Sequence, residues 1–376
     1  MTAKIARFLE NVRPVTPCVV VDLDVVRENY LGLRHWLPLA EVYYAVKANP
    51  APEIVRMLSE MGSRFDVASR GEIDLCLASG AQADRISFGN TIKKQRDIAY
   101  AYEKGVRLFA FDSEGELEKL AESAPGARVF CRILMTCDGA EWPLSRKFGC
   151  EIDMAKDLLV RARDLGLEPY GVSFHVGSQQ TDLSQWDIAV GKAAMLFTAL
   201  DGCGIELKMV NLGGGFPAKY RTDIPVVERY AGAVMDAMTK HFGNSIPAMI
   251  IEPGRSLVGD AGILETEVVL ISRKGYDDDT RWVYLDVGKF GGLAETMDEA
   301  IKYRIQTTRD GEETAPVVLA GPTCDSADIL YEKAGYEMPV NLKVGDKVRI
   351  LSTGAYTTSY SAVNFNGFEP LKAYFI

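Results

Sequence analysis

A repeated pattern of apolar and polar positions runs from residue 42 to residue 255. Each repeat has a short apolar run, then a Gly, Ser, Asn or Asp residue, and then a segment whose apolar residues recur three and four positions apart, as in helices. Strands that alternate with helices pair in parallel through crossover connections. Eight such runs predict a (β/α)8 barrel of TIM type, which we prefer to a doubly wound sheet. The runs are VYYAVKAN, RFDVAS, RISFGN, RLFAFDS, RVFCRIL, GVSFHVGS, MVNLGGGF and MIIEPGR.

The pattern changes after residue 258. The runs GILETEVVLISRK, TRWVYLDVGKF, APVVLAGP and KVRILSTGAY are strand-like and have little helix between them, which predicts an all-β domain. The N-terminal run TPCVVVDLD is also strand-like, and we expect it to pair with this domain. The predicted fold is therefore α/β plus all-β, with the barrel over residues 25–258 and a β-sheet or β-barrel domain from residues 1–24 and 259–376.

Chemically distinctive residues follow the predicted barrel strands. In such barrels the catalytic groups lie at the carboxyl ends of the strands, whereas a barrel without a site would end its strands in ordinary turn residues. The residues at these ends are Lys47, Asp66, Asn90, Asp112, His175, Ser178, Gly213 to Gly215, Glu252 and Arg255. Their variety predicts a functional site at this end of the barrel.

Lys47 lies at the end of the first run, EVYYAVKANP. An apolar run without alternation that stops at Asn49 and Pro50 is typical of a strand buried on both faces. A lysine at this point could extend its ammonium group into solvent. Alternatively, it could be desolvated enough to lose its proton near neutral pH, as Schiff-base chemistry requires. The choice between the two depends on the other strand ends.

Two of those ends supply a phosphate site and an acid. NLGGGFP, residues 211–217, has three consecutive glycines, which let backbone N–H groups approach an anion. The G-x-G-x-x-G spacing of a dinucleotide site is absent, so phosphate is favoured over NAD. EPGR adds Glu252, able to pair with a protonated ring nitrogen, and Arg255, able to bind phosphate. With the lysine, these features indicate pyridoxal 5'-phosphate.

Composition narrows the classes of partner. The 376 residues include 42 basic and 52 acidic side chains, a formal net charge of −10, so nucleic acid or an anionic membrane would have to overcome repulsion. We see no signal peptide and no apolar run of about 18 residues, and we expect a cytoplasmic protein without membrane contact. The seven cysteines form no C-x-x-C pair and the three histidines lie far apart, so we expect no metal site.

Several motifs between Thr16 and Phe368 follow one another in an order shared with a known family. They are YYAVKANP, FDVASRGE, FHVGS, NLGGGFP, EPGR, GPTCDSAD and GAYTTSYSAVNFNGF. On these motifs the chain resembles the fold-type III pyridoxal-phosphate decarboxylases, specifically ornithine decarboxylase and its bacterial lysine/ornithine relatives. The resemblance implies decarboxylation of L-ornithine to putrescine and CO2 in polyamine biosynthesis, with L-lysine to cadaverine as a further activity.

The resemblance also assigns roles to individual residues. Lys47 would be the Schiff-base lysine, with Asp66 near it, and Glu252 would pair with the pyridine nitrogen. His175 would stack on the cofactor ring. The phosphate would be held by Ser178, Gly214, Gly215, Gly254, Arg255 and Tyr356. Glu252 also argues for decarboxylation, because alanine racemases, similar in barrel and lysine, place an arginine at that nitrogen.

Further roles fall in the predicted β domain. The resemblance implies that Cys324 is the acid that protonates the substrate carbon, that Asp325 binds the distal amine of the substrate, and that Tyr356 also lies at the substrate. In the family this segment reaches into the site of the partner subunit. The resemblance therefore implies a homodimer whose active sites are shared between subunits, with the β domain contributing to the interface.

Two segments depart from the animal ornithine decarboxylases. In EWPLSRKFG, Pro143 stands where the animal enzymes have an arginine, and Arg146 is displaced, so we assign Arg146 no catalytic role. In KFGGLAETMDEAIKY, three acidic residues replace the tyrosine–aspartate substrate contact: Glu295, Asp298 and Glu299. Any of these carboxylates could bind the distal amine. We also expect the long connection over residues 135–149 to act as a lid over bound substrate.

Two rival functions stay open. Diaminopimelate decarboxylase typically has glutamate where Asp325 follows the cysteine, and it needs an arginine-rich pocket for a second carboxylate. A catalytically inactive homologue that binds a regulatory partner, as antizyme inhibitors do, could lose Lys47, the phosphate cradle or Cys324, yet all are present. Ornithine and lysine differ by one methylene, worth only about 1 to 3 kcal/mol in a pocket, so the sequence does not separate them.

Overall fold

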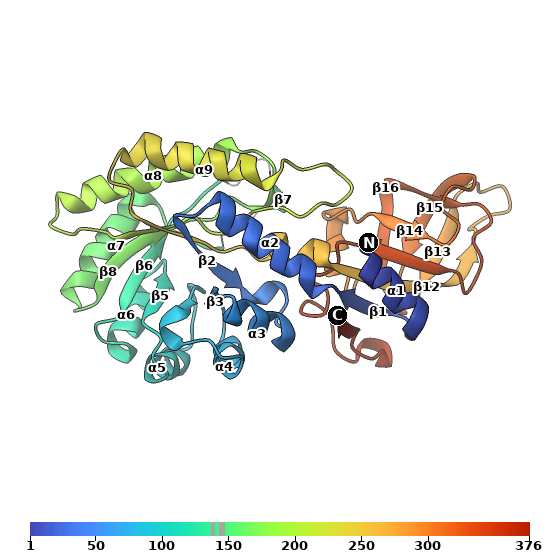
Figure 1. The fold of residues 1–376 in the computed structure, drawn as a ribbon, viewed down its shortest axis with the longest axis horizontal. Helices are drawn as coiled ribbons and strands as arrows, with labels where there is room; N and C mark the ends of the chain where they lie inside the picture. Colours follow the sequence, from blue (N-terminus) through green and yellow to red (C-terminus); the bar gives the residue numbers. More distant parts are fainter. Residues whose placement is uncertain (137–139, 143–146) are drawn as a thin grey trace. The chain divides into compact units, whose positions relative to one another are not determined.

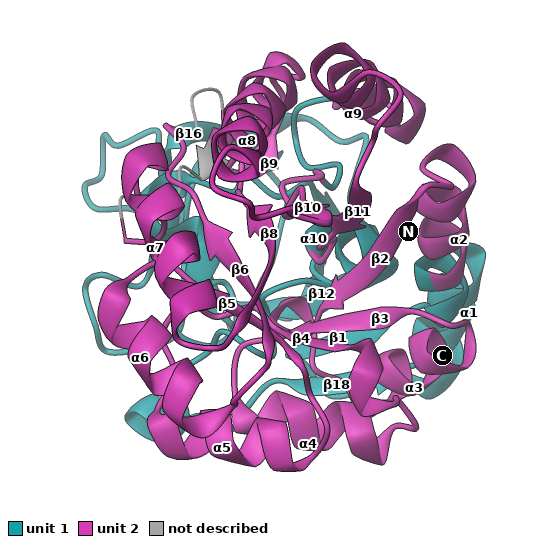
Figure 2. Cartoon of the chain, turned by 90° about the vertical axis from the view of Figure 1, so that its left-hand side faces the viewer, with its two compact units in different colours: residues 1–26, 218–223, 255–376 teal, residues 27–217, 224–254 magenta. Residues whose placement is uncertain are grey.

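The structure is a computed structural model that describes residues 1–136, 140–142 and 147–376. It has two compact units, coloured separately in Figure 2: residues 27–217 with 224–254, and residues 1–26 with 218–223 and 255–376. The sequence prediction assigned residues 218–223 and 255–258 to the barrel, whereas the structure groups them with the β-rich unit. Arg221 illustrates why, since its guanidinium donates hydrogen bonds to the carbonyl oxygens of Ala334 (2.6 Å) and Gly335 (3.0 Å).

The larger unit is a closed barrel of parallel strands, some of which are labelled in Figure 1 and all of which are labelled in Figure 2. Each of the eight predicted runs supplies one strand, which confirms the predicted (β/α)8 class. The strands are β2 Ala40–Ala45, β3 Arg64–Val67, β4 Ile86–Phe88, β5 Leu108–Phe111, β6 Arg128–Arg132, β8 Glu168–Ser173, β10 Met209–Asn211 and β11 Ala248–Ile251. Pairing of β11 with β2, with Met249 opposite Ala40, closes the barrel.

Helices cover the outside of the barrel (Figure 2), and a cluster of buried side chains lies inside it. Tyr43, Leu108, Phe130, Met209 and Ile250 belong to one buried cluster contributed by different strands, so this part of the interior is packed core. The helices are α2 Leu23–Trp36, α3 Pro52–Glu60, α4 Arg70–Ala78, α5 Gln95–Glu103, α6 Glu114–Ser123, α7 Ile152–Asp164, α8 Ser184–Asp201 and α9 Val227–Phe242.

The smaller unit is built on an eight-stranded sheet. Its strands are β1 Cys18–Val21, β12 Gly262–Ser272, β13 Arg281–Leu285, β14 Ile305–Thr307, β15 Thr314–Ala320, β16 Ile329–Pro339, β17 Lys347–Leu351 and β18 Lys372–Phe375. Strand β1 pairs antiparallel with β12 and parallel with β18. The expectation that the N-terminal strand joins the β domain is therefore confirmed.

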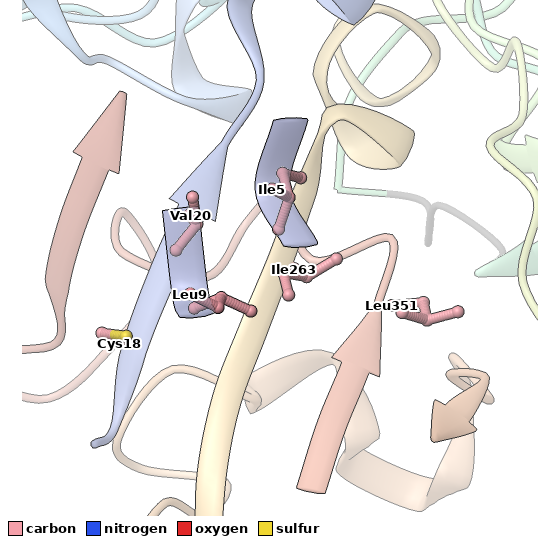
Figure 3. Close-up of a cluster of buried hydrophobic side chains, with 6 residues drawn as sticks. All are labelled: Ile5, Leu9, Cys18, Val20, Ile263 and Leu351. Carbon is pink, nitrogen blue, oxygen red and sulfur yellow. The ribbon is translucent and has the colours of Figure 1, made fainter. Parts of the chain in front are cut away.

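An N-terminal helix that the sequence did not predict, α1 Ala3–Val12, packs on this sheet. Thr2 caps it by accepting a hydrogen bond from the N–H of Ile5 (3.2 Å). Ile5 and Leu9 are buried in a cluster with Cys18, Val20, Ile263 and Leu351 (Figure 3). The apolar face of α1 thus covers part of the sheet formed by β1, β12 and β17.

The connection between β6 and α7 contains a short strand, β7 Ala140–Trp142, which pairs with β9 Ser178–Gln180. The expected lid falls largely on this connection, and residues 137–139 and 143–146, Pro143 and Arg146 among them, lie outside the described part of the chain. The lid thus stays a prediction. Elsewhere, within the described ranges, no helix combines the length and apolarity that crossing a membrane requires.

Candidate active site

A cavity of about 190 Å³ lies at the carboxyl ends of the barrel strands. It brings together four residues that the sequence singled out for chemistry: Lys47, Asp66, His175 and Glu252. Its wall also includes Ala68, Gly89, Asn90, Phe130, Arg132, Phe148, Ser173 and Phe174. An amine, two carboxyl groups and an imidazole therefore share one concave site.

The sequence prediction placed Lys47 near the end of its strand, whereas in the structure Lys47 lies two residues beyond it. Strand β2 stops at Ala45, and Lys47 belongs to a 3-10 turn, η1 Val46–Ala48. Its side chain is 52% exposed and its Nζ is 3.9 Å from Asp66 Oδ2. Of the two alternatives for Lys47, the structure therefore does not show a side chain buried in the strand; the side chain instead lines the cavity.

Asp66 is buried opposite Lys47, at the end of β3. Its carboxyl pKa is raised well above the usual value, first by burial and then by the charge of Glu252, with Lys47 opposing. Oδ1 is buried and makes no hydrogen bond within the described residues. A Cβ at position 89 would lie 1.9 Å from this oxygen, so only glycine leaves room for it. The site thus holds a buried polar atom that a bound group can satisfy.

His175 is held as a neutral ring. Burial lowers its pKa well below the usual value, and the nearby charges of Arg132 and Lys47 lower it further. The N–H of Gly177 donates a hydrogen bond to Nδ1 (3.0 Å), so in the neutral ring the proton resides on Nε2. His175 therefore presents a flat, uncharged face, as packing against an aromatic ring requires.

Asn211, at the end of β10, orients Glu252. Its Nδ2 donates to Glu252 Oε1 (2.5 Å), and its Oδ1 accepts from the N–H of Gly213 (2.9 Å). The backbone N–H of Glu252 in turn donates to the carbonyl of Gly213 (2.8 Å). Sequence reasoning missed this role, although Asn211 is the first residue of NLGGGFP. Because both of its amide atoms are engaged, the carboxylate is held in one direction.

The glycine loop packs too closely for larger residues. Gly215 has φ +96°, and a Cβ there would lie 2.7 Å from the carbonyl oxygen of Gly177, the residue before Ser178. A Cβ on Gly214 would lie 2.8 Å from the carbonyl oxygen of Glu252, and one on Gly254 would lie 2.9 Å from Ala48 Cβ. These positions form a tight backbone cradle beside Lys47 and Glu252, and a small anion can approach such a cradle closely.

Two further residues at or near strand ends differ from the prediction: Arg132 lines the cavity although it was not predicted, and Asp112 was predicted but does not line it. Arg132, which sequence reasoning missed, lines the cavity with its guanidinium 5.0 Å from the Phe148 ring. Its signal was the polar residue near the end of RVFCRIL. Asp112 does not line the cavity, and its Oδ2 instead accepts a hydrogen bond from the N–H of Gly149 (2.7 Å). Asp112 therefore anchors the end of the β6–α7 connection.

The predicted phosphate ligand Arg255 belongs to the β-rich unit, where it begins the short helix α10 Arg255–Val258. It is 5% exposed and forms a two-pronged ion pair with Glu295, at 2.6 and 2.5 Å. It also donates to the Tyr220 hydroxyl (2.6 Å), and its guanidinium lies 4.9 Å from the Tyr356 ring. Glu295 was one of three candidates for the distal amine of the substrate, and in this structure both of its oxygens bind the guanidinium.

The other two candidates for the distal amine lie in the same 3-10 segment, η4 Ala294–Glu299. Glu299 Oε1 accepts hydrogen bonds from the N–H groups of Glu332 and Lys333, each at 2.7 Å. Asp298 is exposed, has φ +52°, and makes no hydrogen bond or ion pair with any residue that the structure describes. Of the three candidate carboxylates, that of Asp298 is therefore the one available to bind the distal amine of a substrate.

The GPTCDSAD loop presents Cys324 and Asp325 at the surface of the β-rich unit. The N–H of Cys324 donates to Asn366 Oδ1 (2.8 Å). Asp328, which sequence reasoning missed, is 3% exposed and accepts from the N–H and hydroxyl of Thr323 (3.1 and 2.7 Å). Among the described cysteines Cys324 alone is exposed, which argues against an inert core thiol.

The barrel cavity fits pyridoxal phosphate by its donor set: a lysine amine, an oriented carboxylate, a flat neutral imidazole and a tight glycine cradle. The described residues contain no group of three or more His, Cys, Asp or Glu side chains that could hold a metal ion.

Comparison with known proteins also indicates a pyridoxal phosphate site. Residues 23–259 match the family model of the pyridoxal-binding domain of pyridoxal-dependent decarboxylases. The chain is 38% identical over 355 residues to the lysine/ornithine decarboxylase of Selenomonas ruminantium, covering 94% of this chain and 88% of that one. It is 34% identical to antizyme inhibitor 2 of Xenopus laevis, covering 93% and 78%.

Solved structures agree with these relatives. One of them is the crystal structure of SrLDC in complex with pyridoxal phosphate (PLP) and cadaverine. Its superposition on this chain has a TM-score of 0.89 at 34% sequence identity, and it covers 100% of this chain and 94% of that one. A likeness over the whole chain includes the β-rich unit as well as the barrel. The chain therefore belongs to the pyridoxal-dependent decarboxylases, in the family of the ornithine and lysine decarboxylases, and its cofactor is pyridoxal phosphate.

Proposed function

We propose that the protein removes the α-carboxyl group of L-ornithine to give putrescine and CO2, and that it also accepts L-lysine to give cadaverine. The observation that carries the proposal is the gathering of Lys47, Asp66, His175 and Glu252 in one barrel cavity. Bound pyridoxal phosphate supplies an electron sink for the electron pair that remains when the carboxylate leaves. A diamine product suits a role in polyamine biosynthesis.

We assign each of the four cavity residues a separate role. Lys47 would hold the cofactor and give way to the amine of the substrate. Glu252, oriented by Asn211, would keep a proton on the ring nitrogen. Asp66 lies 3.9 Å from the Lys47 amine, and its raised pKa supports a part in exchanging a proton with that amine. His175 would pack its neutral ring against that of the cofactor.

We propose separate sets of residues for the phosphate of the cofactor and for the substrate. Ser178, Gly214, Gly215, Gly254, Arg255 and Tyr356 stay the proposed phosphate ligands. For the distal amine we propose Asp298 together with Asp325, since Glu295 and Glu299 are engaged elsewhere. Cys324 is the proposed acid for the substrate carbon. We further propose a homodimer in which Cys324 and Asp325 serve the site of the partner subunit.

Product analysis tests the substrate. The purified holoenzyme is incubated in parallel with ornithine, lysine, arginine and diaminopimelate, with Lys47→Ala as the control for background. Putrescine from ornithine, with cadaverine from lysine at lower kcat/KM, is the expected result. Product from diaminopimelate or arginine alone would overturn the substrate assignment. No product from any substrate, with cofactor bound, would instead favour an inactive regulatory homologue.

A further inference from the structure

A second lysine of the barrel, Lys93, is buried beside the cofactor cavity. It lies in the loop between β4 and α5, and its side chain is 0% exposed. Its Nζ donates to the carbonyl oxygens of Asn90 (2.7 Å) and Ala110 (2.6 Å) and lies 3.0 Å from Glu116 Oε1. One ammonium group thus joins the loop after β4, strand β5 and helix α6.

The ion pair with Glu116 is a costly way to fill this space. Glu116 is 3% exposed, and its other partner is Lys119, at 2.5 Å. Removing two charges from water costs several kcal/mol for each ion, and well-packed apolar residues of similar volume often serve stability as well. Stability alone therefore gives no reason for a lysine here. The hydrogen bonds of Lys93 do give a reason, because their directions determine where the loop between β4 and α5 lies.

The loop that Lys93 anchors forms one wall of the cavity. Gly89 and Asn90 both line the cavity. The N–H of Gly89 donates to the carbonyl of Val67 (3.1 Å), and Asn90 Nδ2 donates to that of Ala68 (3.3 Å). Gly89 also lies directly against Asp66 Oδ1, where even a Cβ would not fit. A shift of this loop would therefore move the wall that confines Asp66.

We propose that Lys93, together with Glu116, is a positioning residue that holds the Gly89–Asn90 wall against Asp66 and so sets the shape of the cavity for its cofactor. The inference rests on the proposed assignment of this cavity to pyridoxal phosphate. Lys93 itself does not line the cavity and acts through the loop.

The protonation of Lys93 gives the positioning role a signature. Burial lowers the pKa of Lys93 to about 8, while Glu116 opposes the shift. The charged groups that face Lys93 are Glu116 and Lys119 on α6 and Asp112 after β5. Above pH 8 the ammonium loses its proton and its ionic attraction to Glu116. Cofactor affinity of the wild type should therefore fall as pH rises through 8.

The first test replaces both charges by apolar residues of similar size, Lys93→Met with Glu116→Leu. The melting temperature should stay close to that of the wild type, whereas the dissociation constant of pyridoxal phosphate should rise about tenfold or more. Spectrophotometric titration of the full chain with pyridoxal phosphate, after the bound cofactor has been removed, measures this constant. The matched control is Lys94→Met, because Lys94 is an exposed neighbour of Lys93. This substitution should change neither the melting temperature nor the dissociation constant of pyridoxal phosphate. An unchanged dissociation constant in a folded double variant would overturn the proposal.

A second variant tests the positioning role of Lys93 if the double variant does not fold. Glu116→Gln keeps the size and one acceptor but removes the charge that supports the protonated Lys93, so the pKa of Lys93 falls further. The midpoint of the alkaline loss of cofactor affinity should then move to lower pH than in the wild type. An unchanged midpoint would contradict the inference. Failure of the wild type to bind pyridoxal phosphate would instead defeat the proposed function.

Discussion

At the scale of single residues, neighbouring carboxylates of one short segment have different tasks. Glu295 is 6% exposed and binds both nitrogens at the end of the Arg255 side chain. Asp298, three residues later, is exposed and unpaired within the described chain. A buried guanidinium needs a counter-charge, whereas a substrate ammonium needs a carboxylate that is still available. The two residues should therefore respond differently to the same loss of charge.

The prediction compares Asp298→Asn with Glu295→Gln, which both replace a carboxylate by an amide of equal size. Asp298→Asn should raise the KM for ornithine about tenfold or more, since the distal ammonium loses its ionic partner, while the melting temperature stays unchanged. Glu295→Gln should lower stability by about 3 to 5 kcal/mol, because Arg255 is left with an uncompensated buried charge. Steady-state kinetics and thermal unfolding measure the two effects.

The reverse outcome has a clear meaning. If Glu295→Gln raised the KM at unchanged stability and Asp298→Asn did not, the substrate amine would belong to Glu295, and its pairing with Arg255 would have to break when substrate binds.

At the scale of elements, α1 is held to its sheet by a few apolar side chains. Leu9 belongs to the cluster that also contains Ile5, Val20 and Ile263 (Figure 3). It is 4% exposed, whereas Val12 on the same helix is 52% exposed. A helix of 10 residues is marginal by itself in water, so α1 depends on this packing. Truncation at the two positions should therefore have very different effects.

We predict that Leu9→Ala lowers the free energy of unfolding by about 2 to 5 kcal/mol, because it removes buried methyl groups and leaves a cavity. Val12→Ala, the exposed control on the same helix, should change it by less than about 0.5 kcal/mol. Denaturant unfolding followed by circular dichroism measures both. Equal effects of the two substitutions would show that the helix is not anchored through its apolar face.

At the scale of the whole molecule, the proposed dimer makes a prediction that no single subunit can fulfil. Lys47→Ala protein and Cys324→Ala protein are mixed after each has been shown to be poor at forming diamine. If Cys324 serves the site of the partner subunit, each mixed dimer contains one intact site. Random reassortment should then restore about a quarter of wild-type diamine formation. Differently tagged subunits and a pull-down confirm that exchange has occurred.

Free exchange without recovery of activity would contradict the shared-site proposal. Lys47 and Cys324 would then have to act within the same chain, and the role of the GPTCDSAD loop would need to be assigned again.

The sequence by itself determined the features that depend on local pattern. Eight apolar runs with helices between them predicted the closed barrel, because the periods of strands and helices are written along the chain. Lys47, the glycine loop and Glu252 were found because barrel strands carry their chemistry at one end. The N-terminal strand was assigned to the β domain because its run is strand-like and precedes the barrel. Strand β16 was missed, because Glu332, Lys333, Gly335 and Glu337 interrupt its apolar pattern.

Only the tertiary structure decided which of these groups are engaged with one another. Asn211 and Glu252 are 41 residues apart, and Arg255 and Glu295 are 40 apart, so no local pattern could reveal that one pair orients an acid and the other neutralises a guanidinium. In the sequence nothing distinguishes Lys93 from other polar residues of a loop, yet its side chain is fully buried in the structure. Burial and partnership arise when distant segments meet, and this meeting separates a carboxylate that lines the cavity from one that neutralises a buried guanidinium.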